Sequence, residues 1–349
     1  MKKSLLLFIL CSLFSGMTVI NAKQTALPPD QRFDAYKERF VLALWKVYPA
    51  WASSVGYHKY DHLLVIPDEA SRKKELAFCK AHLDSLSSFN VAALSDVNKT
   101  DYQMMENQLK YAQWTIHELK SYQWDPSGYN VSGGFAEMLG NDYEPLDKRL
   151  RNFFKKMAGI PAYYEAAKKN IINPSKEHVD LAIEQNNGGL SVFKEDLEEA
   201  LRKSHLSVQE KKDMKLRALA ASKAIKGYVV WLQGLKNEHP RSFRLGNELY
   251  ANKFIYELQS GYTPDEIYKK AMRHKASLHK KMHLLTKELW PKYFGREAIP
   301  ADRTTAIKQM IDVLSLKHTT PDSFQAAIEQ QIPTLITFIQ NKNLIYIDP

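Results

Sequence analysis

The chain has 349 residues, with 49 lysines and arginines against 39 acids, which gives a formal charge of +10. Hydrophobic residues make up 44% of it, so the chain is long and apolar enough to bury a sizeable core. Its basic residues are interspersed with acids and do not gather on one face, which argues against nucleic acid as a partner.

The N-terminus has the pattern of a secretory signal peptide. Lys2 and Lys3 precede an apolar run from Leu5 to Ile20, and Ala22 suits the position just before a cleavage site. An uncleaved membrane anchor is the alternative, but the run is short for spanning a bilayer. We therefore expect cleavage after residues 1–22, an exported protein in the periplasm or outside the cell, and no stable membrane span afterwards.

Cleavage would change the cysteine count and the charge. Cys11 would leave, so Cys79 would remain alone and no internal disulfide could form. Two lysines would leave without an acid, so the formal charge would fall from +10 to +8. The stability of the mature part, residues 23–349, must then come from its apolar core.

Apolar periodicity predicts an all-α protein, a multi-helix array with long amphipathic helices. One helix follows Thr100, where Gln103 completes a capping pattern, and another follows Thr263 and stops at Pro291. Adjacent glycines at Asn187-Gly188-Gly189 predict a kink. The other expected helices are 30–47, 68–88, 145–158, 161–171, 174–203, 207–236, 247–259, 303–317 and 321–340.

Residues 121–145 form the longest segment without clear periodicity. The segment carries aromatic residues, Tyr129 among them, together with four glycines. Long ordered loops in compact domains often carry function. This segment is therefore also where we place a subdomain break within residues 23–349.

The C-terminus predicts a short strand, because Leu344 to Ile347 are apolar, β-branched or aromatic and Asp348-Pro349 favours a turn. A lone strand needs a partner for its backbone groups. We expect the partner to lie in another molecule or in a missing C-terminal half of a longer protein. The apolar ridge before the strand also predicts self-association through residues 332–347.

Two histidine pairs have the four-residue spacing of a helical zinc site. His279 and His283 lack the neighbouring glutamate that metal-assisted hydrolysis needs, because Lys280 stands there, so a solvated helix face is favoured. His58 and His62 lie in a predicted loop and are weak candidates. No nucleophile elbow, P-loop or dinucleotide motif is present, so we assign no catalytic residue and no metal ligand.

From Arg149 onward the sequence resembles the bacterial domain-of-unknown-function family 885. The segments that carry the resemblance are Met157 to Tyr164, Asn170 and Pro174, Ala182 to Gln185 with Gly188, Phe243 to Tyr250, Gly261 to Ile267, and Trp290 to Phe294; upstream, Tyr48-Pro49, Gly56, Tyr60-Asp61 and Asp125-Pro126 also fit. Together these segments cover most of the mature chain.

That family is similar to helical zinc metallopeptidases of the zincin type, whose H-E-x-x-H helix lies in the C-terminal half. This chain ends before such a helix, so the resemblance implies only an N-terminal portion that forms one wall of a substrate cleft. Zinc is expected in a complete relative, with no cofactor in this chain. The implied function is part of a peptidase-like hydrolase, inactive alone, with a peptide-like substrate.

Three residues are candidates for substrate binding: Arg244, Tyr250 and Tyr129. The guanidinium of Arg244 could bind a substrate carboxylate in a bidentate manner, beside Gly246, which would permit a close backbone approach. The alternatives are a structural ion pair for Arg244 and a core position for Tyr250. The rival function is a non-catalytic helical module that binds peptides or cell-wall fragments in the periplasm.

Overall fold

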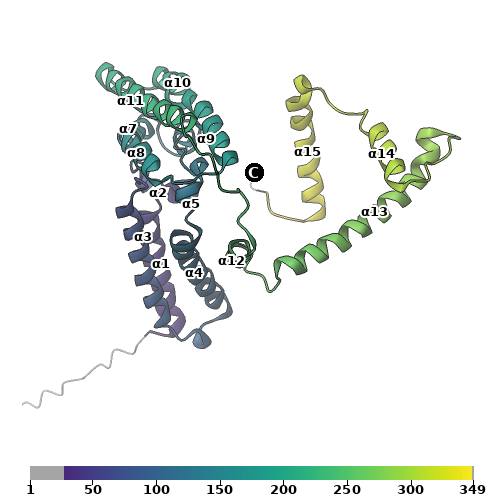
Figure 1. Ribbon diagram of the computed structural model, residues 1–349, viewed down its shortest axis with the longest axis horizontal. Coiled ribbons are helices and arrows are strands. Elements are labelled where there is room, and N and C mark those ends of the chain that lie inside the picture. The colour runs from purple at the N-terminus through teal and green to yellow at the C-terminus, as the bar shows by residue number, and fades with distance from the viewer. Residues whose placement is uncertain (1–26, 348–349) are drawn as a thin grey trace, which may run out of the picture. The chain divides into compact units, whose positions relative to one another are not determined.

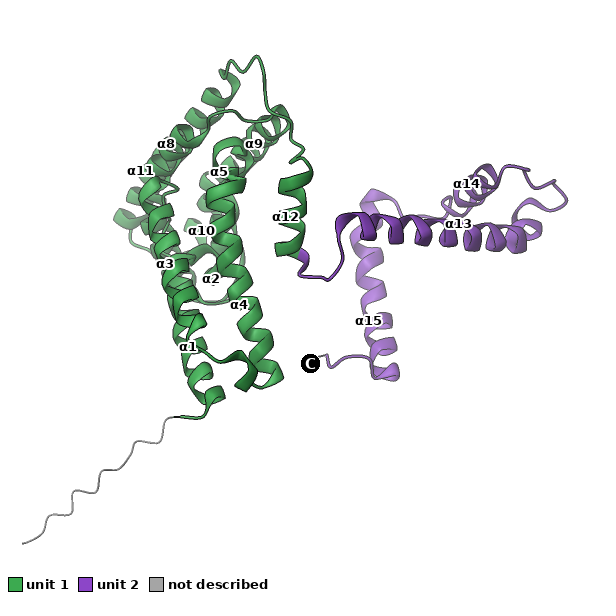
Figure 2. Ribbon diagram, turned by 60° about the horizontal axis from the view of Figure 1, so that its bottom comes forward, with its two compact units in different colours: residues 1–257 green, residues 258–349 purple. Residues whose placement is uncertain are grey.

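The computed structural model describes residues 27–347, and every regular element in that range is a helix, as the sequence predicts. The predicted signal peptide lies outside the described residues. No helix in the described range is long and apolar enough to cross a membrane. The chain divides into two compact units, unit 1 up to Glu257 and unit 2 from Leu258 (Figure 2). Residues 121–145 lie inside unit 1.

Unit 1 consists of helices joined by short connections (Figure 1). In chain order these are α1 (Pro29–Val47), α2 (Pro49–Ser54), α3 (Glu69–Ser87), α4 (Asp96–Trp114), α5 (Ser121–Trp124), α6 (Ser132–Gly140), α7 (Leu146–Met157), α8 (Ile160–Asn170), α9 (Lys176–Gly188), α10 (Glu195–Lys203), α11 (Val208–Gln233) and α12 (Asn247–Leu258), the last residue of which belongs to unit 2.

Helices α1, α3 and α4 pack around the first of two cores in unit 1. The apolar positions of α1 recur every three or four residues, so one face of the helix is buried. The buried members of this core are Phe33, Tyr36, Phe40, Leu44, Cys79, Leu86, Leu94 and Leu109. Cys79 is completely buried, and burial raises the pKa of its thiol to about 12.

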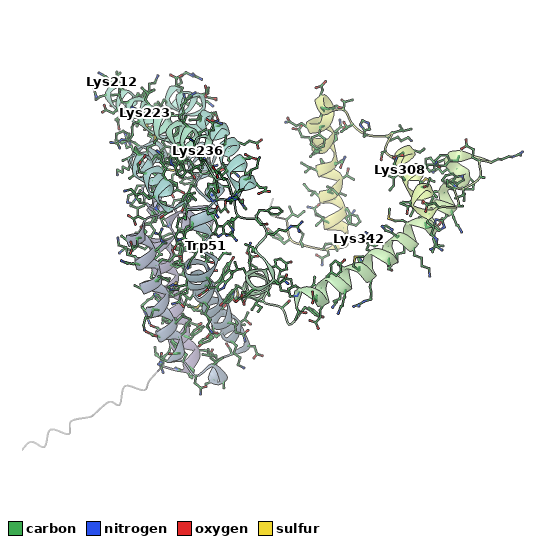
Figure 3. The ribbon with its side chains drawn as sticks, in the orientation of Figure 1. Trp51, Lys212, Lys223, Lys236, Lys308 and Lys342 are labelled. Atoms are coloured by element: carbon green, nitrogen blue, oxygen red, sulfur yellow. The ribbon has the colours of Figure 1, made fainter. Side chains whose placement is uncertain are left out.

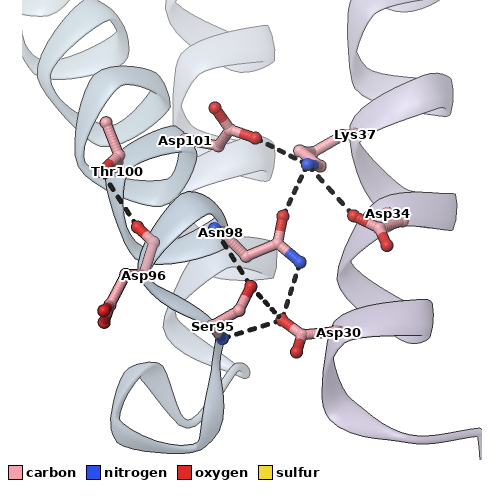
Figure 4. Close-up of polar contacts among 8 residues, drawn as sticks. All are labelled: Asp30, Asp34, Lys37, Ser95, Asp96, Asn98, Thr100 and Asp101. Carbon is pink, nitrogen blue, oxygen red and sulfur yellow. Dashed lines mark hydrogen bonds and ion pairs between the residues drawn. The ribbon is translucent and has the colours of Figure 1, made fainter.

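A polar network fixes α1 against the start of α4 (Figure 4). The Lys37 ammonium lies 2.6 Å from both Asn98 Oδ1 and Asp101 Oδ2. One oxygen of Asp30 accepts hydrogen bonds from the Ser95 backbone N–H at 2.9 Å and from Asn98 Nδ2 at 2.7 Å. These bonds lower the pKa of Asp30, since they favour its charged form. The network sets the register of α1 against α4.

Helices α6 to α11 surround the larger core of unit 1. Phe135, Phe153 and Phe193 meet there with ring centroids 4.7 to 5.9 Å apart. The buried Tyr164 donates its hydroxyl hydrogen to Asn186 Oδ1 at 2.6 Å, so this core holds a satisfied polar pair.

Unit 2 contains α13 (Pro264–Phe294), α14 (Arg303–Leu314) and α15 (Phe324–Lys342), the last preceded by a short 3₁₀ turn. Its core consists of Trp290, Ala306 and Met310. No residue of α15 is buried. The exposed apolar side chains of α13 and α15 are Tyr268, Met272, Leu278, Met282, Leu284, Leu285, Tyr293, Phe324, Ile328, Ile332, Leu335 and Phe338. Unit 2 therefore leaves two amphipathic helices largely uncovered.

Several sequence predictions of helix boundaries are confirmed, including the kink near Gly188-Gly189. There α9 ends, and the 3₁₀ turn η5 (Gly189–Phe193) leads into α10. A Cβ at Gly189 would collide with Ser132, so this position needs glycine. Full capping boxes begin α11 at Ser207 and α13 at Thr263.

Two predictions of helix boundaries and one prediction of a loop are wrong. The helix predicted after Thr100 begins earlier, because Ser95 caps α4 by accepting the Asn98 N–H at 3.4 Å. α13 continues through Pro291 to Phe294, whose ring stacks on Trp290 with centroids 4.0 Å apart, and ends at Gly295 with φ 61°. Residues 121–145, predicted as a loop, contain the short helices α5 and α6, and burial of Phe135 and Met138 in the core offsets the weak helix propensity of the glycines in α6.

The predicted C-terminal strand is also absent from the described residues. Asn343 adopts the left-handed conformation with φ 48°, and the Leu344 N–H bonds to Ile339 O at 3.2 Å. This arrangement ends α15 as a helix cap. Residues 344–347 then continue without regular structure, since the described chain offers no strand with which they could pair.

Candidate functional site

A partly buried polar cluster in unit 1 is the candidate site, and we call Ser53, His58, Asp61 and Tyr143 the Asp61 cluster. Asp61 is 1% exposed and stands at its centre. One carboxylate oxygen accepts the Tyr143 hydroxyl hydrogen at 2.7 Å and lies 3.1 Å from His58 Nδ1. The other accepts the Ser53 hydroxyl hydrogen at 2.5 Å. The three partners together satisfy a carboxylate that water does not reach.

The local sequence explains how Ser53, His58 and Asp61 meet. Ser53 lies in the last turn of α2, and Gly56 then reverses the chain with φ 88°, a conformation that favours glycine. The 3₁₀ turn η1 (His58–Tyr60) follows, and residues three apart in such a turn lie on the same side. His58 and Asp61 are therefore brought together by local geometry, whereas Tyr143 is recruited by the tertiary fold.

Tyr143 packs against His58 in the cluster, and Arg149 lies near its ring. The rings of His58 and Tyr143 stack with centroids 3.4 Å apart and planes 6° apart. Burial and the neighbouring Asp61 raise the pKa of Tyr143, so its hydroxyl keeps its proton. Arg149 is 4% exposed, and its guanidinium lies 5.8 Å from the centre of the Tyr143 ring. The guanidinium also donates to Asp142 Oδ1 at 2.7 Å and to the backbone carbonyls of Met138 and Leu139.

Lys156 is a second buried cation near Asp61. It is 6% exposed, and its ammonium lies 5.2 Å from the centre of the Phe135 ring. Burial lowers its pKa, and the charges of Asp61 and Glu137 partly oppose that shift. Within residues 27–347, the ammonium makes no hydrogen bond and no ion pair within 4 Å. Lys156 therefore contributes a positive field to the Asp61 cluster without a direct contact.

A small cavity of about 110 Å³ adjoins the cluster, lined by His58 and Tyr143 together with Ser54, Gly134 and Glu137. Nδ1 of His58 is held by Asp61, which leaves Nε2 for a hydrogen bond to a molecule in this cavity. The Ser53 hydroxyl bonds to Asp61 and not to His58, so the geometry of an activated serine nucleophile is missing. The arrangement suits proton transfer or small-molecule binding.

The described residues do not supply a ligand set for zinc. No group of three or more histidine, cysteine or acidic side chains within residues 27–347 could hold a metal ion. His279 is exposed and His283 half-buried on α13, and His58 is engaged with Asp61. Neither histidine pair therefore has the additional ligands that a protein zinc site requires.

Tyr129, one of the three predicted substrate residues, is a core residue in the structure. It is 5% exposed, donates its hydroxyl hydrogen to Tyr122 O at 2.6 Å and accepts one from Asn170 Nδ2 at 3.0 Å. Its ring packs edge-on against Tyr163. These contacts fully account for its side chain.

Arg244 and Tyr250, the other two, are exposed at the entrance to α12. Arg244 makes no ion pair within the described chain, and its guanidinium lies 5.9 Å from the neighbouring Phe243 ring. Tyr250 is 53% exposed, and no hydrogen bond joins it to Arg244. Gly246 has φ 81° and open space around its Cα, and its left-handed backbone conformation forms the turn into α12.

The sequence predicts only a weak metal motif at His58 and His62, and it does not predict the partnership of Asp61 with Tyr143. Tyr143 is 82 residues away along the chain, so no local pattern connects the two. The local signal available was Gly56 followed by closely spaced histidine and aspartate. Such a turn predicts a His–Asp contact, but not the ring that stacks on it.

Comparisons with known proteins identify one family and one similar solved structure. A model of the family "Bacterial protein of unknown function (DUF885)" matches residues 49–348. No curated protein matches the sequence. The chain is similar to a solved structure from Shewanella oneidensis, described as a putative lipoprotein of unknown function, with 44% identity and a TM-score of 0.78. The match covers 91% of this chain and 59% of the Shewanella chain. The protein therefore belongs to the DUF885 family.

Proposed function

We propose that this chain is the substrate-binding wall of an exported zinc-peptidase-like hydrolase and does not hydrolyse peptides alone. Its part in the reaction is to hold a peptide carboxylate at Arg244. The resemblance to zincin-type peptidases supports the reaction class, and the Shewanella relative's description as a lipoprotein supports export. No step is assigned to a metal held by this chain, because its described residues offer no ligand set.

The observation that carries the proposal is the unpaired guanidinium of Arg244 on an anchored loop. The loop between α11 and α12 is tied down by Asn237, which donates to Asn173 Oδ1 at 2.9 Å and to Pro174 O at 3.0 Å. It is also held by Arg241, which lies 4.2 Å above the Trp124 ring. An exposed arginine on such a loop can bind a carboxylate in a bidentate manner with little loss of loop entropy.

Binding of a dye-labelled peptide to the purified protein, measured by fluorescence anisotropy, tests this role. Arg244→Ala should weaken binding of a peptide with a free C-terminal carboxylate about tenfold, and amidation of that carboxylate should weaken binding to the original protein equally. Lys236→Ala is the matched control, because Lys236 is an exposed cation of the same loop (Figure 3). Arg244→Lys should recover binding only in part.

Two outcomes would contradict the proposal. The first is equal affinity of carboxylate and amide peptides for the original protein. The second is cleavage of the peptide by this chain alone, detected by mass spectrometry in the presence of zinc. Carboxylate-dependent binding that persists without cleavage after the remaining part of a longer relative is supplied would favour the non-catalytic binding module.

A further inference from the structure

An apolar groove of about 610 Å³ runs between α10 and α11 in unit 1. Its floor consists of Phe193, Leu197 and Leu201 on one side and Ala218 on the other. Each of these side chains is less than 9% exposed. Leu219 forms an open edge and is 67% exposed. The volume of the groove falls in the range of small-molecule sites, and charged side chains from both helices border its apolar residues.

The groove lies between the two helices of a hairpin, and one ion pair between these helices belongs to its lining. Residues 204–207 connect them, and Lys211 closes the turn by donating to Ser204 O at 3.0 Å. Farther along, Lys215 on α11 and Glu198 on α10 pair at 2.7 Å. Because consecutive helices with a short connection run antiparallel, the start of α10 lies beside the later turns of α11.

This hairpin gives the groove a charged end and an apolar end. Lys194, at the start of α10, and Lys223 and Lys226, in the later turns of α11, line the same end. All three are exposed and none has an ion pair within the described residues, whereas Lys215 is already paired with Glu198. Glu195 is the one unpaired acid there, so the rim remains positively charged overall.

We propose that the groove binds a long-chain fatty acid, with its carboxylate at Lys223 and Lys226 and its hydrocarbon tail on the floor formed by Leu197, Leu201 and Ala218. The three unpaired ammonium groups complement one anionic head, and the adjoining apolar floor complements an unbranched tail. This site is separate from Arg244 and from the Asp61 cluster, so the proposal does not depend on the proposed hydrolase function.

The fluorescent fatty acid cis-parinaric acid, displaced by unlabelled competitors, measures occupation of the groove in the purified protein. Hexadecanoate should displace the probe, and its affinity should exceed that of dodecanoate by up to roughly fourfold for each added methylene that is buried. Hexadecanol should compete about tenfold more weakly, because it lacks the charge. Leu219→Asp and the pair Lys223→Glu with Lys226→Glu should each weaken hexadecanoate about tenfold.

Matched controls lie on the same helix outside the groove. Leu216→Asp changes an exposed leucine, and Lys212→Glu changes an exposed lysine that is labelled in Figure 3. Neither residue lines the groove. Both variants should keep the original affinity, and circular dichroism should show unchanged helix content in every variant. Equal loss in the control and groove variants, or no change in any variant, would overturn the proposal by assigning the probe to another apolar surface. Binding only to vesicles of anionic phospholipid, without displacement by hexadecanoate, would also overturn it, in favour of a membrane contact.

Discussion

Units 1 and 2 are built from similar amphipathic helices but bury them to very different degrees. In unit 1, the large apolar side chains of α6 to α11 converge on one continuous core, and Phe135 and Phe153 are completely buried. In unit 2, three residues make up the buried core, and α15 buries none. The two units therefore share the amphipathic pattern of their helices but differ in how much of the apolar face is covered.

The comparison also teaches what an amphipathic pattern means. A helix with an apolar stripe indicates that some surface covers the stripe, but not which surface. For α7 and α8 that surface lies in unit 1. For α13 and α15 most of the apolar stripe is exposed within the described chain, which is the property expected of helices that pack against further protein.

The largest effect is expected from a matched pair of phenylalanines. Phe153→Ala should lower the free energy of unfolding of unit 1 by about 3–5 kcal/mol, because it leaves a cavity between Phe135 and Phe193. Phe338→Ala on α15, where the ring is 53% exposed, should change stability by less than about 0.5 kcal/mol. Guanidinium unfolding followed by circular dichroism measures both. Equal losses would show that α15 is covered in solution and would remove the contrast.

The core of unit 2 provides the next test. Trp290→Ala removes the ring that stacks on Phe294 and the indole N–H that bonds to Glu297 O at 2.9 Å, so it should cost about 3 kcal/mol within unit 2. Hydrogen exchange should then accelerate across α13 and α14 while α6 to α11 remain protected. Faster exchange throughout unit 1 would mean that the two units unfold together.

The Asp61 cluster predicts a smaller effect. Asp61→Asn should lower the stability of unit 1 by about 1–3 kcal/mol, because the three partners of the buried carboxylate lose a charged acceptor. Ser53→Ala should cost less, since it removes only one of those bonds. Thermal unfolding followed by near-ultraviolet circular dichroism reports the change. Unaltered stability in Asp61→Asn would leave proton transfer by His58 as the better account of the cluster.

Self-association through residues 332–347 remains a prediction, now centred on the exposed face of α15. Replacing both Leu335 and Phe338 by lysine should raise the dimer dissociation constant at least tenfold, about 1.4 kcal/mol, without loss of helix. Light scattering across a concentration series measures this. Should the original protein remain monomeric at every concentration, the exposed stripe would not act as a self-association surface.

The smallest effect concerns two equivalent capping boxes, one in each unit. Hydrogen bonds from Ser207 and the Arg151 guanidinium lower the pKa of Glu210 to about 2, and bonds from Thr263 lower the pKa of Glu266. A lowered carboxylate pKa stabilises the folded state above the unfolded value, near 4.5, and this contribution is lost as pH falls toward about 2. Glu210→Gln and Glu266→Gln should each flatten that dependence slightly. If the acid-unfolding curve is unchanged in both variants, the pH dependence of stability arises from other groups.

The sequence predicts individual helices well because their signals are local. Ser207 and Thr263 define their helix starts, and Gly188-Gly189 marks the kink, from neighbouring residues alone. The sequence does not predict the end of α13, because packing of Trp290 on Phe294 extends the helix about one turn beyond Pro291. Local propensity has no information about such a contact.

The site and the unit boundary depend on contacts between distant residues. Tyr143 reaches Asp61 across 82 positions, and no spacing rule could have joined them. Likewise α12 belongs mostly to unit 1 because Asn107 and Tyr111 of α4 bond to Tyr256 and Glu257. Exposure of Arg244 and Tyr250 is equally a tertiary property, and it favours neither the ion-pair nor the core alternative for them.

The buried thiol of Cys79 provides a chemical probe for opening of the α1–α3–α4 bundle. Its complete burial and a pKa near 12 leave almost no reactive thiolate in the folded state, so alkylation must wait for the bundle to open. In a protein that carries serine in place of Cys11, iodoacetamide can label only Cys79. The labelling rate would therefore report how often this bundle opens. The dependence of this labelling rate on denaturant concentration would distinguish local opening of the bundle from complete unfolding of the protein.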